Sequence, residues 1–188
     1  ILELGPRYGR SAQGGEEPIM VEFVSANPTG PLHLGHGRQA ALGDAVAALL
    51  EWTGWKVHRE YYYNDAGAQI DRLAESVRGR YREHFGRPGE IPEGGYQGEY
   101  VREVAAAFAK AFGDRWVDDD SQEALDAIRE FSVRALREVQ DEDLHQFRVY
   151  FDHYFLESSL YTSGSVERTV EELRATGMVY EKDGAVWL

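Results

Sequence analysis

Apolar and polar residues alternate near the start of the chain in a pattern that predicts two strands flanking one helix. Residues 19–24 (Ile-Met-Val-Glu-Phe-Val) are rich in β-branched and apolar side chains, and residues 55–63 share that character, so both segments are expected to be strands. Between them, residues 36–52 favour a helix that is apolar nearly all round, which is typical of a buried helix. Gly54 stands where a C-terminal cap belongs. This unit predicts an α/β fold with parallel strands joined by a right-handed crossover.

Helical spacing of apolar residues returns along the middle of the chain. Asn64-Asp65 is expected to cap a helix whose apolar residues lie between positions 70 and 81. Residues 86–98 contain five glycines and two prolines and are predicted to form a mobile loop. Two further helices and a strand are then expected at residues 99–112, 121–144 and 149–155. The apolar stripe of the longer helix comprises Leu125, Ile128, Ala135, Leu136 and Val139.

The last part of the chain is predicted to contain one helix and one hairpin. Thr162-Ser163 is expected to cap the helix, which Gly177 ends. Residues 178–181 and 185–188 flank Asp183-Gly184, a dipeptide that is strongly favoured in two-residue hairpin turns.

Composition narrows the possible classes of protein. The 188 residues carry 33 acids against 20 bases, a net charge of −13 that would repel a phosphate backbone over most of the surface. The absence of cysteine excludes disulfides, cysteine zinc sites and a thiol nucleophile. No apolar run approaches the roughly 20 residues of a membrane helix, and no leader pattern opens the chain. We therefore expect a soluble, cytoplasmic protein without a membrane partner.

The segment from Asn27 to Arg38 carries the candidate chemistry. It follows a predicted strand and opens a predicted helix, which is where open α/β sheets place ligands and where helix amides attract anions. His33 and His36 flank Gly35, so a phosphate can approach the backbone while both imidazoles donate hydrogen bonds to it. This arrangement predicts a nucleotide-phosphate site.

The two histidines alone also permit a solvated loop or half of a metal site. A zinc site would need a third ligand. The remaining histidines have no distinctive spacing, and no metal site is predicted from them; they are His58, His84, His145 and His153.

Four motifs in order along the chain resemble one known family. The Pro-Leu-His-Leu-Gly-His string at 31–36 resembles the HIGH signature of class I aminoacyl-tRNA synthetases. Residues 21–31, 62–70, and 151–160 with 177–188 are similar to arginyl-tRNA synthetases in particular. The resemblance covers about residues 19–85 and 147–188. It implies the first half of a Rossmann-like nucleotide-binding fold with helical segments and part of an inserted subdomain.

The resemblance also implies an enzyme of protein biosynthesis and a set of site residues. Such a ligase activates L-arginine with ATP and Mg²⁺ to arginyl-adenylate and transfers the arginine to tRNA(Arg). The resemblance assigns catalysis to His33 and His36, and ATP binding to His33, Gly35 and His36. It assigns arginine binding to Glu22, Ser25, Ala26, Asn27, His36 and Glu157. An acidic pocket suits the substrate, because a guanidinium pairs with carboxylates in bidentate geometry.

Several of these residues have a plainer explanation. Glu22 could be an outward residue of an alternating strand, and Glu157 an ordinary surface acid. Asn64, Asp65 and Gln69 are expected only to cap a helix. Arg38 could contact phosphates or pair with an acid on its own helix.

The chain also departs from the family pattern. It has no lysine-rich KMSKS-type loop, since its only lysines are Lys56, Lys110 and Lys182. We therefore expect an irregular lead-in at 1–18, half of the catalytic domain at 19–157 and the start of an insertion at 158–188. Contacts with tRNA are expected mainly in the full-length synthetase of which this chain would be a part. The enzyme fragment is expected to be inactive or weakly active alone, and the alternatives are a non-catalytic module that binds ATP or arginine and a bare folded fragment.

Overall fold

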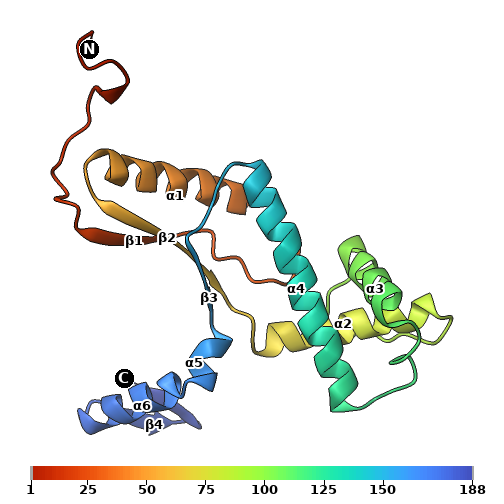
Figure 1. Ribbon diagram of the computed structural model, residues 1–188. Coiled ribbons are helices and arrows are strands. Elements are labelled where there is room, and N and C mark those ends of the chain that lie inside the picture. The colour runs from red at the N-terminus through yellow and green to blue at the C-terminus, as the bar shows by residue number, and fades with distance from the viewer. Residues whose placement is uncertain (1, 188) are drawn as a thin grey trace.

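Three parallel strands form the sheet on which the molecule is built (Figure 1). The computed structural model describes residues 2–187. Strands β1 (Pro18–Glu22), β2 (Lys56–Tyr63) and β3 (His153–Leu156) lie in that order, and helix α1 (Leu34–Trp52) connects the first two. β1 is parallel to β2, and β2 to β3, with the pair Glu60–His153 in register. The predicted strand–helix–strand unit and the mixed α/β fold with a parallel sheet are confirmed.

The prediction that α1 is buried all round is wrong. Only Ala40, Gly43 and Ala47 of this helix are buried, whereas Leu42 and Leu49 are each 66% exposed. The buried residues recur at spacings of three and four and form a single face against the sheet. Within residues 2–187, no other helix or strand packs on the opposite face of α1. The helix ends as predicted, because Gly54 adopts a positive φ of 90° and donates its amide to the Glu51 carbonyl.

Three helices between β2 and β3 enclose a second core. They are α2 (Ala68–His84), α3 (Glu99–Phe112) and α4 (Gln122–Gln146). Their buried side chains form one hydrophobic cluster. Figure 1 shows α2 and α3 lying away from the sheet. The core contributed by the sheet comprises Phe23, Val24, Ala26, Ala40, Tyr61, Tyr63, Leu144 and Val149. Of these three helices only α4 contributes to the sheet core, near its C-terminal end, so α4 connects the two hydrophobic cores. No helix in residues 2–187 has both the length and the apolar composition needed to cross a membrane.

The glycine-rich segment 86–98 lies close against α2. A Cβ atom on Gly89 would lie 2.1 Å from the Gly79 carbonyl oxygen, so no side chain fits at that position. Ser76 accepts a hydrogen bond from the Tyr96 amide at 3.0 Å. These contacts explain several of the glycines by close backbone approach. The mobility of this segment stays a prediction.

Two predicted helix caps are wrong. Gly67, without a side-chain cap, precedes α2, and the Asp65 carboxylate instead accepts hydrogen bonds from the amide and hydroxyl of Ser158, at 2.9 and 2.7 Å. Asp65 therefore ties the end of β2 to the segment after β3. Left-handed Gly164, rather than Thr162-Ser163, precedes α6 (Ser165–Ala175). The sequence predicts a helix over residues 121–144, and the structure places α4 there; its cap is Ser121, whose hydroxyl oxygen accepts from the Ala124 amide at 3.2 Å.

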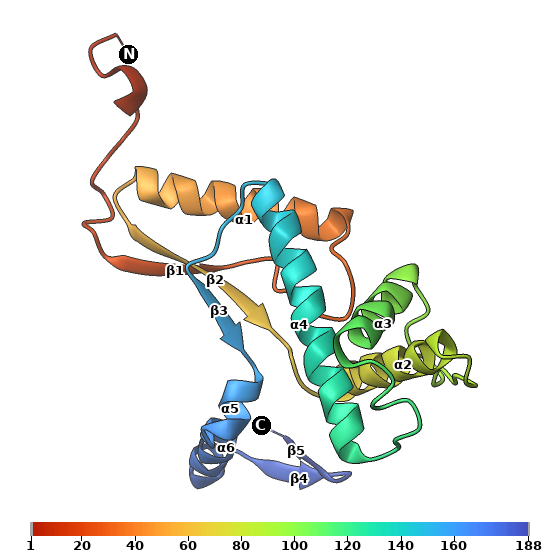
Figure 2. The ribbon, with the colours of Figure 1, turned by 45° about the vertical axis from the view of Figure 1, so that its right-hand side comes forward.

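The C-terminal part lies beyond the end of β3 (Figure 2). It consists of α5 (Ser158–Thr162), α6 and an antiparallel hairpin of β4 (Tyr180–Lys182) and β5 (Ala185–Trp187). The hairpin turn is the predicted one, because Asp183 and Gly184 both have positive φ. Leu188, the predicted end of the hairpin, lies outside the described residues, as does Ile1 of the lead-in. A short 3₁₀ turn, η1 (Gly5–Arg7), interrupts an otherwise irregular lead-in.

Strand β3 begins four residues later than predicted. Val149 is buried in the sheet core before the strand starts, and Arg148 has a positive φ of 63° that turns the chain out of α4. Val149 and Phe151, two of the apolar residues that predict a strand there, therefore pack into the sheet core instead. The domain boundaries expected at residues 18 and 157 stay predictions.

Candidate functional site

A strained turn ends β1 and opens the candidate site. Val24 and Ser25 have φ values of 67° and 42°, and the Ser25 amide donates to the Phe23 carbonyl at 3.0 Å. This is a three-residue turn in its rare, positive-φ form, centred on a β-branched residue. Such backbone costs of order 1–3 kcal/mol for each residue and persists where the surrounding structure fixes it.

Two buried side chains hold the loop that follows this turn. The Tyr61 hydroxyl accepts from the Ala26 amide at 3.0 Å and donates to the Ala26 carbonyl at 3.1 Å. Gln140 of α4 is 1% exposed, and its side-chain amide donates to the carbonyls of Asn27 and Gly30 at 3.1 and 2.7 Å. The loop is thus fixed by hydrogen bonds from a neighbouring strand and from a helix far along the chain.

His33 and His36 form a reciprocal cap at the start of α1. His33 Nδ1 accepts from the Gly35 amide at 3.1 Å, and His36 Nδ1 accepts from the His33 amide at 3.3 Å. An Nδ1 that accepts carries no proton, so each neutral ring carries its proton on Nε2. The rings stack with centroids 3.7 Å apart and an interplanar angle of 16°. The backbone therefore sets the tautomer of both rings and leaves two Nε2–H donors, on stacked rings, for a ligand.

The pKa of His36 lies below its ordinary value of 6.5, first because the ring is partly buried and second because His33 is next to it. In the window from 6.5 down to that lowered pKa, the unfolded chain binds more protons than the folded one, so stability falls as the pH falls. We expect the urea midpoint of the parent chain to decrease more than that of a His36→Asn variant between about pH 8 and about pH 5.5. Equal decreases in the two proteins would contradict this.

A cavity of about 580 Å³ lies in front of the two histidines. This volume is within the range of small-molecule sites. Its wall includes five of the predicted site residues, Ser25, Ala26, Asn27, His33 and His36. The other lining residues are Val24, Thr29, Gly30, Pro31, Gln39, Tyr96 and Tyr100. Gly35 does not line the cavity, and its amide instead donates to His33 Nδ1.

The two tyrosines of this wall were not predicted from the sequence. Tyr96 lies in the glycine-rich segment 86–98 and Tyr100 in the first turn of α3, so the region between β2 and β3 supplies one side of the cavity. The Tyr100 hydroxyl donates to the Thr29 carbonyl at 2.8 Å. Gly30 leaves room for the same ring, since a Cβ atom there would lie 3.3 Å from it. Nothing in the spacing of these residues indicates the contact, because the pairing is set by the packing of α2–α4.

The two predicted acids lie beside the cavity rather than in its wall. Glu22 accepts from the Ser25 hydroxyl at 2.6 Å, and that hydroxyl oxygen accepts from the Tyr62 amide at 3.2 Å. The Tyr62 hydroxyl donates to Glu157 at 3.0 Å. Burial, and then the hydrogen bond to Glu157, raise the pKa of Tyr62 to about 12, so the hydroxyl keeps its proton at neutral pH. Tyr62 therefore connects the two acids at the C-terminal ends of the strands, through its amide and Ser25 to Glu22 and through its hydroxyl to Glu157.

Gln69 also contributes to the loop, contrary to the expectation that it only caps a helix. Its side-chain oxygen accepts from the Asn27 amide group at 2.7 Å. Asn27 is therefore held through its side chain by α2 and through its carbonyl by Gln140. Arg38 is exposed and forms no ion pair with any residue between 2 and 187.

Known proteins resemble this chain over its whole length. Residues 2–188 match the family described as tRNA synthetases class I (R), catalytic domain. The chain belongs to the class I arginyl-tRNA synthetase family. An arginine–tRNA ligase of Ralstonia nicotianae is 54% identical over the entire chain, which spans 32% of that relative.

Solved structures of arginyl-tRNA synthetases agree with this placement. A Campylobacter jejuni protein assigned as an arginyl-tRNA synthetase superposes with a TM-score of 0.85 and 32% identity, over 100% of this chain and 40% of that one. The Thermus thermophilus enzyme gives a TM-score of 0.59 over 90% of this chain and 29% of its own, at 23% identity, a likeness of fold. This synthetase chain spans about a third of the length of the curated relatives it matches.

Proposed function

We propose that this chain supplies the nucleotide-binding part of an arginine–tRNA ligase, a soluble enzyme of the cytoplasm. In the proposed reaction the carboxylate of L-arginine attacks the α-phosphorus of ATP, and the arginine later passes to tRNA(Arg). The observation that carries the proposal is the His33–His36 pair. Its two Nε2–H donors lie on stacked rings beside a cavity of suitable volume and have no hydrogen-bond partner within residues 2–187.

The pair suits a transition state in which negative charge grows on phosphate oxygens. Its donors are held in place by backbone amides, so little reorganisation accompanies the reaction. The neutral rings stabilise the developing charge without the permanent charge of a lysine. We expect ATP to bring Mg²⁺ as its complex, because none of the residues lining the cavity is a carboxylate and triphosphate oxygens are themselves good magnesium ligands.

Arginine is expected to bind between the loop and the strand ends. Ser25, Ala26, Asn27 and His36 form its wall beside the nucleotide, and Glu22 and Glu157 supply carboxylates for the guanidinium. Ser25 and Tyr62 hold these acids in a common network. A charged group in such a site is recognised strongly, since removing its partner leaves a charge unpaired.

Titration calorimetry with Mg·ATP tests the nucleotide site on the chain itself. We expect His36→Asn to weaken binding by roughly 10–100-fold, the equivalent of one charge-assisted hydrogen bond. Asparagine keeps an oxygen near the position of Nδ1 that can still accept from the His33 amide, so the variant should remain folded while it loses the distal donor. His84→Asn, an exposed histidine on α2, is the matched control and should bind like the parent.

A second titration with L-arginine tests the acids separately. Glu22→Gln should weaken arginine binding by at least roughly tenfold and leave Mg·ATP binding unchanged. If ATP affinity is the same in the parent and in His36→Asn, the nucleotide site is misplaced. If neither ligand gives heat with the parent chain, it is a bare folded fragment. Binding of both without ATP–pyrophosphate exchange in the presence of tRNA would make it a non-catalytic module.

A further inference from the structure

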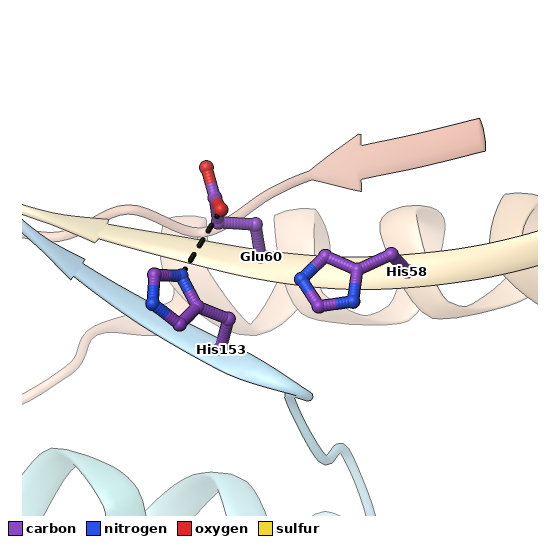
Figure 3. Close-up of side chains that lie close together, drawn as sticks. All are labelled: His58, Glu60 and His153. Carbon is purple, nitrogen blue, oxygen red and sulfur yellow. Dashed lines mark hydrogen bonds and ion pairs between the residues drawn. The ribbon is translucent and has the colours of Figure 1, made fainter. Parts of the chain in front are cut away.

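Three potential metal ligands meet on the face of the sheet away from α1 and α4. His58 and Glu60 lie two residues apart on β2 and therefore point to the same face, and His153 is the direct partner of Glu60 on β3. Figure 3 shows the His58 ring directed along β2 towards the other two side chains. One ligand atom from each residue lies within 4.8 Å of the others. Sequence spacing alone could not show this meeting, because residues 64–152 separate the two strands.

The donor types favour a transition metal over magnesium or calcium. Two imidazoles and one carboxylate are ligands that Zn²⁺ and its neighbours prefer, whereas Mg²⁺ and Ca²⁺ favour oxygen-rich sites. With metal–ligand bonds of about 2.0–2.1 Å, tetrahedral donors lie roughly 3.3 Å apart. His153 Nδ1 and Glu60 Oε2 are already 3.1 Å apart. Small rotations of His58, whose side chain is exposed, would complete the set.

The electrostatic surroundings also favour a cation. The Glu60 carboxylate is 17% exposed and, within residues 2–187, has no lysine or arginine partner. Arg59 next to it points to the other face and pairs with Glu51 of α1 at 2.6 Å. Glu22 is the register partner of Glu60 on β1 and adds a second negative charge on the same face. Lys56 is a positive charge on the same face, but it lies two residues before His58, at the end of β2 that is farther from Glu60.

We propose that His58, Glu60 and His153 form a site for one Zn²⁺-type ion that fastens β2 to β3. Three protein ligands would leave the remaining coordination position to water. The site is separate from the His33–His36 pair, whose Nδ1 atoms are engaged by backbone amides. It does not depend on the proposed ligase function.

Metal titrations of the 188-residue chain test this assignment. Zn²⁺ is titrated by calorimetry and Co²⁺ by its visible absorption, which is intense in tetrahedral sites. We expect one ion per chain, a rise in thermal midpoint with Zn²⁺, and no such response to Mg²⁺. His58→Asn, Glu60→Gln and His153→Asn should each weaken Zn²⁺ binding by at least about tenfold, as loss of a ligand must exceed loss of an outer-shell partner.

Two controls separate this site from other histidines. His84→Asn, an exposed residue of α2, should bind Zn²⁺ like the parent. Without metal, all variants should show the parent's circular dichroism and thermal midpoint, because none of the substituted side chains belongs to either hydrophobic core. The proposal is overturned if the three variants bind Zn²⁺ as the parent does. It is equally overturned if binding is lost in His33→Asn or His36→Asn and kept in the three variants.

Discussion

The Gln140→Met variant should unfold about 2–4 kcal/mol more readily than the parent chain. Methionine matches the length of glutamine but cannot donate, so the carbonyls of Asn27 and Gly30 lose the hydrogen bonds that they accept from Gln140. Each buried polar group left without a partner costs about 1–3 kcal/mol. Urea unfolding measures the loss as a midpoint lower by roughly 1 M or more, given usual denaturant slopes.

The same substitution should also weaken Mg·ATP binding. The loop that Gln140 holds lines the cavity from Asn27 to Gly30, so a looser loop places the cavity wall less well. Gln146→Met, at the exposed end of the same helix, is the matched control and should change neither quantity. A Gln140→Met variant with the parent's urea midpoint would show that water satisfies the two carbonyls equally well.

Replacing Gly43 with alanine should destabilise the chain, although alanine is the better helix former. A Cβ atom at Gly43 would lie 2.2 Å from Phe23 Cγ, and Phe23 cannot retreat freely because its ring packs on Phe151 with centroids 4.5 Å apart. Overpacking of this kind costs about 1–3 kcal/mol beyond any gain in propensity. Thermal unfolding should report a decrease of roughly 2–4 °C for each kcal/mol.

The same glycine-to-alanine substitution at another position of α1 should stabilise the chain rather than destabilise it. A Cβ atom at Gly37 meets nothing within 4 Å, so Gly37→Ala should raise stability by up to about 1 kcal/mol. Shortening the clashing ring should rescue the first variant, so that Phe23→Leu with Gly43→Ala is more stable than the sum of the two single changes. A thermal midpoint of Gly43→Ala at or above that of the parent would contradict the close contact between α1 and Phe23.

The core helices and the strand–helix–strand unit were predictable because local patterns determine them. The helix expected around residues 99–112 is present as α3 (Glu99–Phe112), and its apolar residues recur at helical spacing. α1 illustrates the limit of such patterns, since apolar composition predicts burial only where a second element is present to cover it. Its exposed leucines show that a helix can be apolar without being enclosed by residues 2–187.

The site was predictable where it is continuous in sequence and not where it depends on packing. His33 and His36 carry their own context of glycines, prolines and a helix start. Gln140 gives no such signal, because a glutamine within a helical stripe is indistinguishable from a surface residue until its partners are known. The predicted stripe of α4 included Val139, which is 43% exposed, and passed over Gln140 beside it. Long-range hydrogen bonds explain that error.

The long crossover between β2 and β3 has a consequence for the order of folding. Joining these strands directly would mean closing a loop that runs from residue 64 to 152, and non-local pairings of this kind are slow to form. The α2–α4 core is built from segments closer together in sequence and has its own buried cluster. If the α2–α4 core forms first, it shortens the flexible chain between β2 and β3 and brings β3 close to the sheet. Of the three strands in the parallel sheet, β3 is then the one whose amides are expected to exchange soonest.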